Sequence, residues 1–179
     1  MHNREKQAMA AGSLISPSEY LATSYRPDRD LVDGQLVERN KGEFDHSRLQ
    51  SVLDRWMGKR EREWHIWVLV EQRIRVAPNR FRIPDVCVIS RDEPIEQVFT
   101  RPPLICIEIL SKDDTISSLR ARIEDYTSFG VPDIWVFDPV ARDAWVCTQG
   151  EFRKPEGNVL RATTSPVVIP LADLFADLD

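Results

Sequence analysis

The sequence predicts a mixed α+β fold in which a central mixed sheet is flanked by helices. Short apolar segments separated by proline, glycine and polar turns recur along the chain, a pattern typical of strands. Two longer segments carry apolar residues at helical spacing instead. One of them lies between the apolar runs 104–110 and 134–137, which indicates two parallel strands joined by a right-handed crossover.

The N-terminal part is expected to contain a tail, a short helix and a hairpin. Residues 1–15 are predicted to form a flexible tail, and residues 16–179 a single domain of ordinary size. The sequence SPSE at 16–19 matches a capping box with proline at the first helical position, so a short helix should follow. In the segment 31–37, two short apolar runs flank an Asp-Gly pair, which predicts a β-hairpin.

The middle of the chain is expected to form a long helix followed by strands. Apolar residues at helical spacing predict a helix from about 45 to 63, with Asp45 as its cap. Strands are expected at 67–76 and 81–90. Pro84 interrupts the second strand, because proline cannot donate a hydrogen bond to a neighbouring strand.

The C-terminal half is expected to alternate between strands and helices. A helix capped by Asp113 or Asp114 should run to Phe129, where Gly130 provides a stop. Antiparallel strands are predicted at 144–147, 151–152 and 167–169, and a short terminal helix at 171–178.

The composition is that of an ordinary soluble protein, with 42% apolar and 30% charged residues. No apolar run approaches the roughly 20 residues that a membrane span requires, and the first residues lack an apolar core of signal-peptide length. We therefore expect a cytoplasmic protein with no membrane partner. The net charge of −5 does not by itself support nucleic-acid binding, although it is compatible with carboxylates that hold a metal ion.

Two carboxylates occupy unusual places in the predicted strands. Glu108 lies in the middle of the apolar run LICIEIL, where a buried carboxylate without a partner is costly. Asp85 follows Pro84 inside another strand, at a point where an edge, a bulge or a bend is expected. Taken singly, Glu108 fits a structural ion pair as well as a functional site, and Asp85 fits a simple strand start.

The two carboxylates are more informative together. They lie on successive predicted strands, so pairing of these strands would bring both to one end of the sheet. Two hard oxygen donors side by side suit Mg²⁺ or Mn²⁺, which can polarise a phosphodiester and lower the pKa of a bound water. The sequence therefore predicts a divalent-metal site at Asp85 and Glu108. Acids near the predicted hairpin, Asp30, Asp33 and Glu38, have weaker claims to a site.

Several segments together resemble a known family. Pro84-Asp85 followed by Glu108 to Ser111 resembles the PD-(D/E)XK nuclease pattern. More closely, the order of segments resembles the Uma-type family, whose members are assigned as endonucleases mostly by pattern. These segments are LVDGQL at 31–36, His46 at a helix start, IPDV at 83–86, EILS at 108–111, and Tyr126 with GVPDIW at 130–135. The resemblance covers roughly residues 16–140 and implies a restriction endonuclease-like core and metal-dependent phosphodiester hydrolysis, with DNA as the expected substrate.

The resemblance also implies roles for further residues. By analogy with the family, the Ile109 carbonyl would be a third metal ligand, and His46 would belong to the site. The superfamily pattern places a lysine two residues after the acid, where this sequence has Leu110. In Uma-type sequences the lysine lies in the following helix, four residues before a tyrosine, and this sequence has Arg122 there. Arginine can stabilise charge on phosphate but is a poor general base, and Lys112 is the alternative cation.

Three functions remain open on this evidence. The first is a Mg²⁺- or Mn²⁺-dependent endonuclease, with the catalytic candidates Asp85, Glu108, Arg122, Lys112 and His46. The second is a nucleic-acid-binding or regulatory module on the same fold, in which the missing lysine has weakened catalysis. The third is a structural interaction domain in which Glu108 forms a plain ion pair. A homodimer is compatible with each of them.

Overall fold

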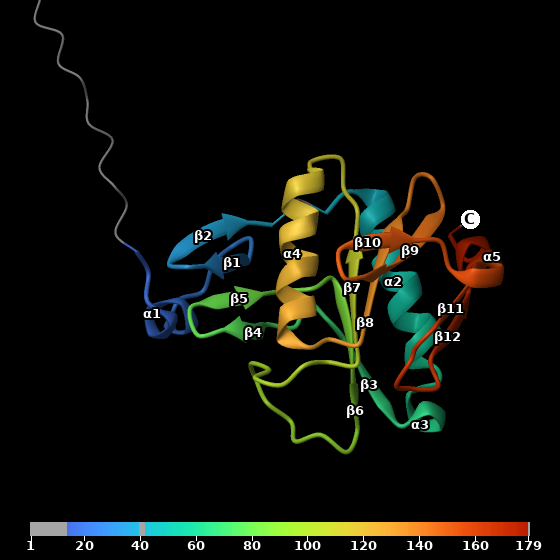
Figure 1. Cartoon of the computed structure of the whole chain (residues 1–179), viewed down its shortest axis with the longest axis horizontal. Helices are drawn as coiled ribbons and strands as arrows, with labels where there is room; N and C mark the ends of the chain where they lie inside the picture. The colour runs from blue at the N-terminus through green and yellow to red at the C-terminus, as the bar shows by residue number, and fades with distance from the viewer. Residues whose placement is uncertain (1–13, 40–41, 179) are drawn as a thin grey trace, which may run out of the picture.

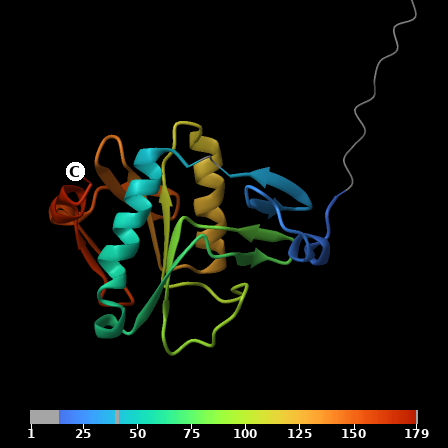
Figure 2. The same ribbon diagram turned by 180° about the vertical axis from the view of Figure 1, so that it is seen from behind.

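The computed structural model describes residues 14–39 and 42–178. A large mixed sheet lies between the two longest described helices, and a smaller antiparallel sheet lies beside one of these helices (Figures 1 and 2). This arrangement confirms the expected mixed α+β fold with a central mixed sheet flanked by helices.

The large sheet has the strand order β10-β9-β8-β7-β6-β3. Its strands are β3 (Ile66–Val70), β6 (Val86–Ser90), β7 (Ile105–Ile109), β8 (Asp133–Asp138), β9 (Asp143–Thr148) and β10 (Glu151–Arg153). Neighbouring strands are antiparallel except β7 and β8, which are parallel and joined by helix α4 (Ile116–Phe129). The predicted strand–helix–strand unit is confirmed. Gly130 ends α4 in the left-handed conformation, with φ of 98°.

Different helices cover the two faces of the large sheet. Because side chains alternate along a strand, β6 and β7 present one set of residues to each face. Helices α2 (Phe44–Gly58) and α5 (Leu171–Ala176) pack on the face that carries Val86, Val88, Ile105 and Ile107. Helix α4 packs on the face that carries Cys87 and Cys106. Strand β7 is therefore buried on both faces, which explains its near-continuous apolar run.

The small sheet has the strand order β2-β1-β5-β4. Its strands are β1 (Arg29–Val32), β2 (Gln35–Glu38), β4 (Ile74–Ala77) and β5 (Arg80–Arg82). The pairing of β1 with β2 confirms the predicted hairpin. The short helix α1 (Pro17–Ala22) packs on this sheet through Tyr20, whose ring centroid lies 5.1 Å from that of Phe81. Strands β11 (Val159–Arg161) and β12 (Val168–Pro170) form a separate pair, of which only β12 was predicted.

Two predicted strands are each divided between the two sheets. The expected strand 67–76 is β3 and β4, separated by a turn in which Glu71 has φ of 52°. The expected strand 81–90 is β5 and β6, separated by Ile83, Pro84 and Asp85. The second division places Asp85 where the chain passes from the small sheet to the large one.

Helix boundaries also differ from the prediction. The expected helix 45–63 is α2 followed by α3 (Glu61–Trp64), and Glu43 rather than Asp45 occupies the cap position of α2. Helix α4 is capped by Thr115, whose side chain accepts a hydrogen bond from the Ser118 N–H, so the cap predicted at 113 or 114 is wrong.

The described residues also bear on the predicted tail and on a membrane. Of the tail predicted at 1–15, residues 1–13 lie outside the described residues, and the Ile15 N–H donates a 2.8 Å hydrogen bond to the Gly34 carbonyl. No helix within 14–39 and 42–178 combines the length and apolar character needed to cross a bilayer.

Strand β3 lies at one edge of the large sheet, and two side chains bind its outer backbone groups. The Glu61 carboxylate accepts a 2.7 Å hydrogen bond from the Val68 N–H. The Arg91 guanidinium donates a 2.8 Å hydrogen bond to the Ile66 carbonyl. Arg91 and Glu61 also form an ion pair at 3.4 Å, so the two side chains cover this edge as a unit.

Candidate active site

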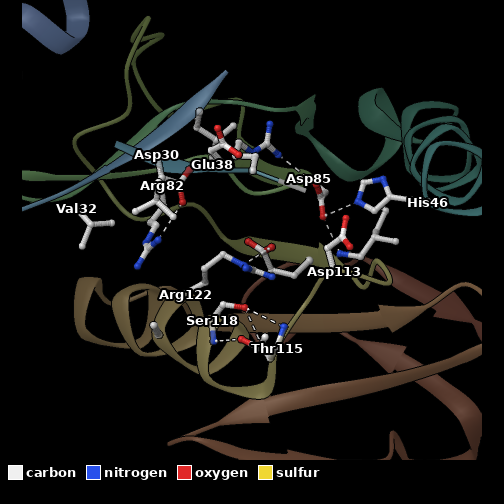
Figure 3. Close-up of a pocket in the computed structure, with 16 residues that line it drawn as sticks. Asp30, Val32, Glu38, His46, Arg82, Asp85, Asp113, Thr115, Ser118 and Arg122 are labelled. Atoms are coloured by element: carbon white, nitrogen blue, oxygen red, sulfur yellow. Dashed lines mark hydrogen bonds and ion pairs between the residues drawn. The ribbon is translucent and has the colours of Figure 1, made fainter. Parts of the chain in front are cut away.

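A cleft of about 450 Å³ opens between the two sheets, beside the N-terminal ends of α2 and α4. Figure 3 shows side chains from the small sheet, the large sheet and both helices directed into it. The main sequence-predicted residues that line the cleft are Asp85, Glu108, Ile109, Arg122 and His46. Of the three acids with weaker claims, Asp30 and Glu38 line it as well, and Asp33 does not. Lys112 is not among the lining residues. Its side chain is 68% exposed and pairs with Glu43.

Strand pairing brings Asp85 and Glu108 together. In the antiparallel pair of β6 and β7, Val86 is opposite Ile107, so the residue before Val86 and the residue after Ile107 are neighbours. Both carboxylates lie on the α4 side of the sheet, because side chains alternate along each strand. Both are buried. Two carboxylates that are withdrawn from water at one point require compensating charge.

Asp85 is held by a backbone amide, an arginine and a histidine. Its Oδ2 accepts a 2.8 Å hydrogen bond from the Ile109 N–H, which fixes the carboxylate against β7. Arg39, immediately after β2, donates to Oδ1 at 3.2 Å. The His46 Nε2 lies 3.3 Å from Oδ2. Burial lowers the pKa of His46, but the hydrogen bond and negative charge of Asp85 more than offset it, so the pKa lies above its ordinary value.

Glu108 has one partner for each carboxylate oxygen. The Tyr126 hydroxyl donates a 2.6 Å hydrogen bond to Oε1, and the Arg122 Nε lies 2.9 Å from Oε2. Burial raises the pKa of Glu108 to about 7, although the charge of Arg122 opposes this shift. The nearby negative charge of Asp85 adds to the rise. A positive charge at the site would therefore strongly stabilise the ionised form of Glu108.

Arg122 is directed to the carboxylates by its place on α4. It precedes Tyr126 by one helical turn, and both side chains reach Glu108. Its Nη2 also donates a 2.8 Å hydrogen bond to Asp114. Burial lowers the pKa of Arg122, but Glu108 and Asp114 raise it above its ordinary value, so the guanidinium remains charged.

A buried ion network ties the small sheet to α4. Arg82 of β5 donates a 2.6 Å hydrogen bond through Nε to Asp125 of α4, and a 3.0 Å hydrogen bond through Nη1 to Asp30 of β1. Arg80 donates a second hydrogen bond to Asp125, at 2.7 Å. Because Asp125 precedes Tyr126, these contacts fix the part of α4 that reaches Glu108.

Sequence reasoning missed several residues of this site. It gave no role to Arg39, Arg82 or Asp125, which lie in ordinary polar positions along the chain. It assigned Tyr126 to the family pattern, and not to a hydrogen bond with Glu108. A signal was available for Tyr126 alone, because a buried tyrosine hydroxyl generally requires a polar partner.

The metal-binding capacity of the site rests on oxygen donors. Within residues 14–39 and 42–178, no group of three or more His, Cys, Asp or Glu side chains is arranged to hold a metal ion. The donors that lie together in the cleft are the carboxylates of Asp85 and Glu108, with the backbone of Ile109 beside them, and Asp30, Glu38 and Asp113 also line it. Such a set suits a hard cation that keeps several water ligands, as Mg²⁺ does.

This fold, with its two carboxylates where antiparallel strands meet the crossover helix, is that of the restriction endonuclease-like class. A solved structure has a similar fold: "Crystal structure of a putative nuclease belonging to DUF820 from Anabaena variabilis ATCC 29413". The two chains are similar with a TM-score of 0.79 and 20% sequence identity, over 92% of this chain and 99% of that chain. At this identity the similarity shows the fold.

The chain belongs to the Uma2 family. The family profile, described as "Putative restriction endonuclease", matches residues 17–176. This match confirms the resemblance on which the sequence analysis drew. No curated protein matches the chain.

Proposed function

We propose that this chain is a divalent-metal-dependent nuclease that hydrolyses phosphodiester bonds, with DNA as its substrate in the cytoplasm. The observation that carries the proposal is the pairing of β6 with β7, which brings Asp85 and Glu108 into one cleft beside the guanidinium of Arg122. Membership of a family described as "Putative restriction endonuclease" supports the same reaction class.

Asp85, Glu108 and the Ile109 carbonyl would hold Mg²⁺ or Mn²⁺. The residues fit such an ion, because the two carboxylates are buried at one point and the charge of Asp85 raises the pKa of Glu108, a repulsion that a bound cation would relieve. All three donors are oxygens, which these hard cations prefer. When bound, the ion would polarise the phosphodiester and lower the pKa of a water molecule.

The side chains around the carboxylates have separate roles in this proposal. Arg122 stabilises the negative charge that develops on phosphate, which requires no proton transfer. Arg39 and His46 neutralise Asp85 before an ion binds, and Arg39 is then placed to contact a phosphate oxygen. Tyr126 orients Glu108 through its hydroxyl. Lys112 pairs with Glu43 outside the cleft, so we assign the cationic role to Arg122.

Incubation of the purified chain with plasmid DNA, single-stranded DNA and RNA, each with Mg²⁺ or Mn²⁺, tests the proposal. We expect slow cleavage with modest sequence preference, fastest with Mn²⁺ on DNA. Nucleic-acid binding without cleavage of any substrate would instead support a binding or regulatory module, the alternative that replacement of the family lysine by Arg122 favours. If the chain neither binds nor cleaves nucleic acid, the remaining function is that of a structural interaction domain.

Manganese is expected to stabilise the folded chain. At a concentration about 100-fold above its Kd, Mn²⁺ should raise Tm by roughly 5–10 °C, because it binds only the folded state. The shift should be larger at pH 8 than at pH 6. With a pKa of about 7, Glu108 is mostly protonated at pH 6, and the ion must then displace a proton.

Differential scanning calorimetry of the parent and of Asp85→Asn measures this effect. The variant keeps an oxygen that can accept the Ile109 N–H but lacks the charge, so its shift should be much smaller. Equal shifts in parent and variant, or none in the parent at millimolar Mn²⁺, would remove the metal site from the proposal.

A further inference from the structure

Asp30 is a third buried carboxylate of the cleft, and it comes from the small sheet. It lies in β1, its residue is 4% exposed, and it lines the same cleft as Asp85 and Glu108. Figure 3 shows Asp30 and His46 at opposite ends of the cleft, with Arg122 reaching in between them. Asp30 therefore faces the reaction space from the side opposite to His46.

One oxygen of Asp30 is uncommitted. Its Oδ2 accepts a 3.0 Å hydrogen bond from Arg82, whereas its buried Oδ1 has no hydrogen-bond partner among the described residues. Asp125, the other carboxylate on Arg82, differs: each of its oxygens accepts a hydrogen bond from an arginine. A buried carboxylate oxygen without a partner is costly, so the Asp30 carboxylate is stabilised when it takes up a proton.

The proposed hydrolysis requires a proton acceptor, and the other groups near the phosphate site are poor candidates. Arg122 remains charged, and Asp85 and Glu108 would be occupied as ligands. The Nε2 of His46 lies 3.3 Å from the Asp85 carboxylate, and although its buried Nδ1 also has no hydrogen-bond partner among the described residues, the ring lies against a proposed metal ligand. Other lining acids are more exposed: Asp113 is an exposed residue, and the side chain of Glu38 is 75% exposed and paired with Arg29.

We propose that Asp30 is the general base of this site, and this inference rests on the proposed nuclease function. Its carboxylate, which lines the cleft and belongs to a side chain that is 6% exposed, accepts a proton from the attacking water as an O–H bond breaks. The water oxygen forms a bond to phosphorus, the bond from phosphorus to the leaving oxygen breaks, and that oxygen takes a proton from solvent water. The carboxyl then returns its proton to solvent.

The charges around Asp30 are compatible with this role. Burial raises the pKa of Asp30 above its ordinary value, although the positive charges of Arg82, Arg39 and Arg122 oppose the shift. A carboxylate with a raised pKa is a better base at neutral pH than an exposed one.

The test compares Asp30→Asn with Asp125→Asn in Mn²⁺-dependent cleavage of a DNA that the parent cleaves. Each variant removes one carboxylate from Arg82, but only Asp30 lines the cleft. Asp30→Asn should lower kcat by roughly 10²–10⁴-fold while KM and the Kd of Mn²⁺ change by less than about threefold. Asp125→Asn should lower Tm comparably and lower kcat by less than about tenfold.

A second pair of variants separates chemistry from folding. Asp30→Glu keeps both a proton acceptor and the charge opposite Arg82, so its kcat should exceed that of Asp30→Asn by at least about tenfold. If Asp30→Asn does not fold, the double variant Asp30→Asn/Arg82→Gln replaces it, because it removes both charges of this pair while Asp125 keeps its hydrogen bond from Arg80.

Several results would overturn the inference. An unchanged kcat in Asp30→Asn removes Asp30 from the reaction, and a weakened Kd for Mn²⁺ would make it a metal ligand instead. An equal loss of kcat in Asp125→Asn would show a purely structural effect. A parent chain that cleaves no nucleic acid would remove the proposed function itself, and the inference with it, whereas the first three results leave that function intact.

Discussion

Asp85→Asn and Glu108→Gln are each expected to abolish metal-dependent cleavage. Each variant removes one of the two negative charges that would hold the ion, while it keeps the shape of the side chain. The substituted amides retain an oxygen for the Ile109 N–H and the Tyr126 hydroxyl, respectively, so the folded structure should persist. Cleavage of labelled DNA by parent and variants under single-turnover conditions measures the loss.

Binding of DNA without metal provides the control for these two variants. Removal of a negative charge near the phosphates should leave this binding unchanged or tighten it. A variant that loses both DNA cleavage and DNA binding would therefore be misfolded. Cleavage that survives in Asp85→Asn, after contaminating nucleases are excluded by a mock purification, would contradict the proposed metal site.

Arg122→Lys is the second substitution with a large expected effect. It restores the cation that Uma-type sequences place at this point, and lysine, unlike arginine, can exchange its proton when its pKa is lowered by burial. In the parent background the variant should cleave at least as fast as the parent. In the Asp30→Asn background it should recover a large part of the roughly 10²–10⁴-fold loss, because it supplies a second group able to exchange a proton.

Arg120→Lys is the matched control for this substitution. Arg120 lies on the same helix, but it is exposed and does not line the cleft, so its replacement should leave kcat unchanged in both backgrounds. If Arg122→Lys slows the parent as much as Arg122→Ala does, the bidentate geometry of the guanidinium matters more than proton exchange.

The carboxylates of the candidate site could be found from sequence because they lie in unfavourable surroundings. Glu108 and Asp85 stand out within apolar strands, whereas Arg122 was a candidate only because of the resemblance to the Uma-type family. The partners of these residues gave no such signal. Arg39 and Asp85 are 46 residues apart in the chain, and only the packing of the small sheet against the large one brings them together.

The errors in the fold have a similar cause. Residues 67–76 and 81–90 each keep a strand-like pattern across the point where the strand is divided between the two sheets. The local sequence pattern does not show which sheet a strand joins. The cap of α4 was misplaced because Asp114 and Thr115 are both good capping residues. The Asp114 carboxylate accepts hydrogen bonds from the Ser111 N–H and from Arg122, and Thr115 caps the helix.

The Glu61 and Arg91 side chains on β3 bear on how copies of this chain can associate. An uncovered edge strand invites a strand from another molecule to extend the sheet, which leads to edge-to-edge dimers or to aggregation. Here an incoming strand would have to displace Glu61 from the Val68 N–H and Arg91 from the Ile66 carbonyl before it could pair. The edge is therefore protected against sheet extension, and a homodimer would form through other surfaces of the molecule.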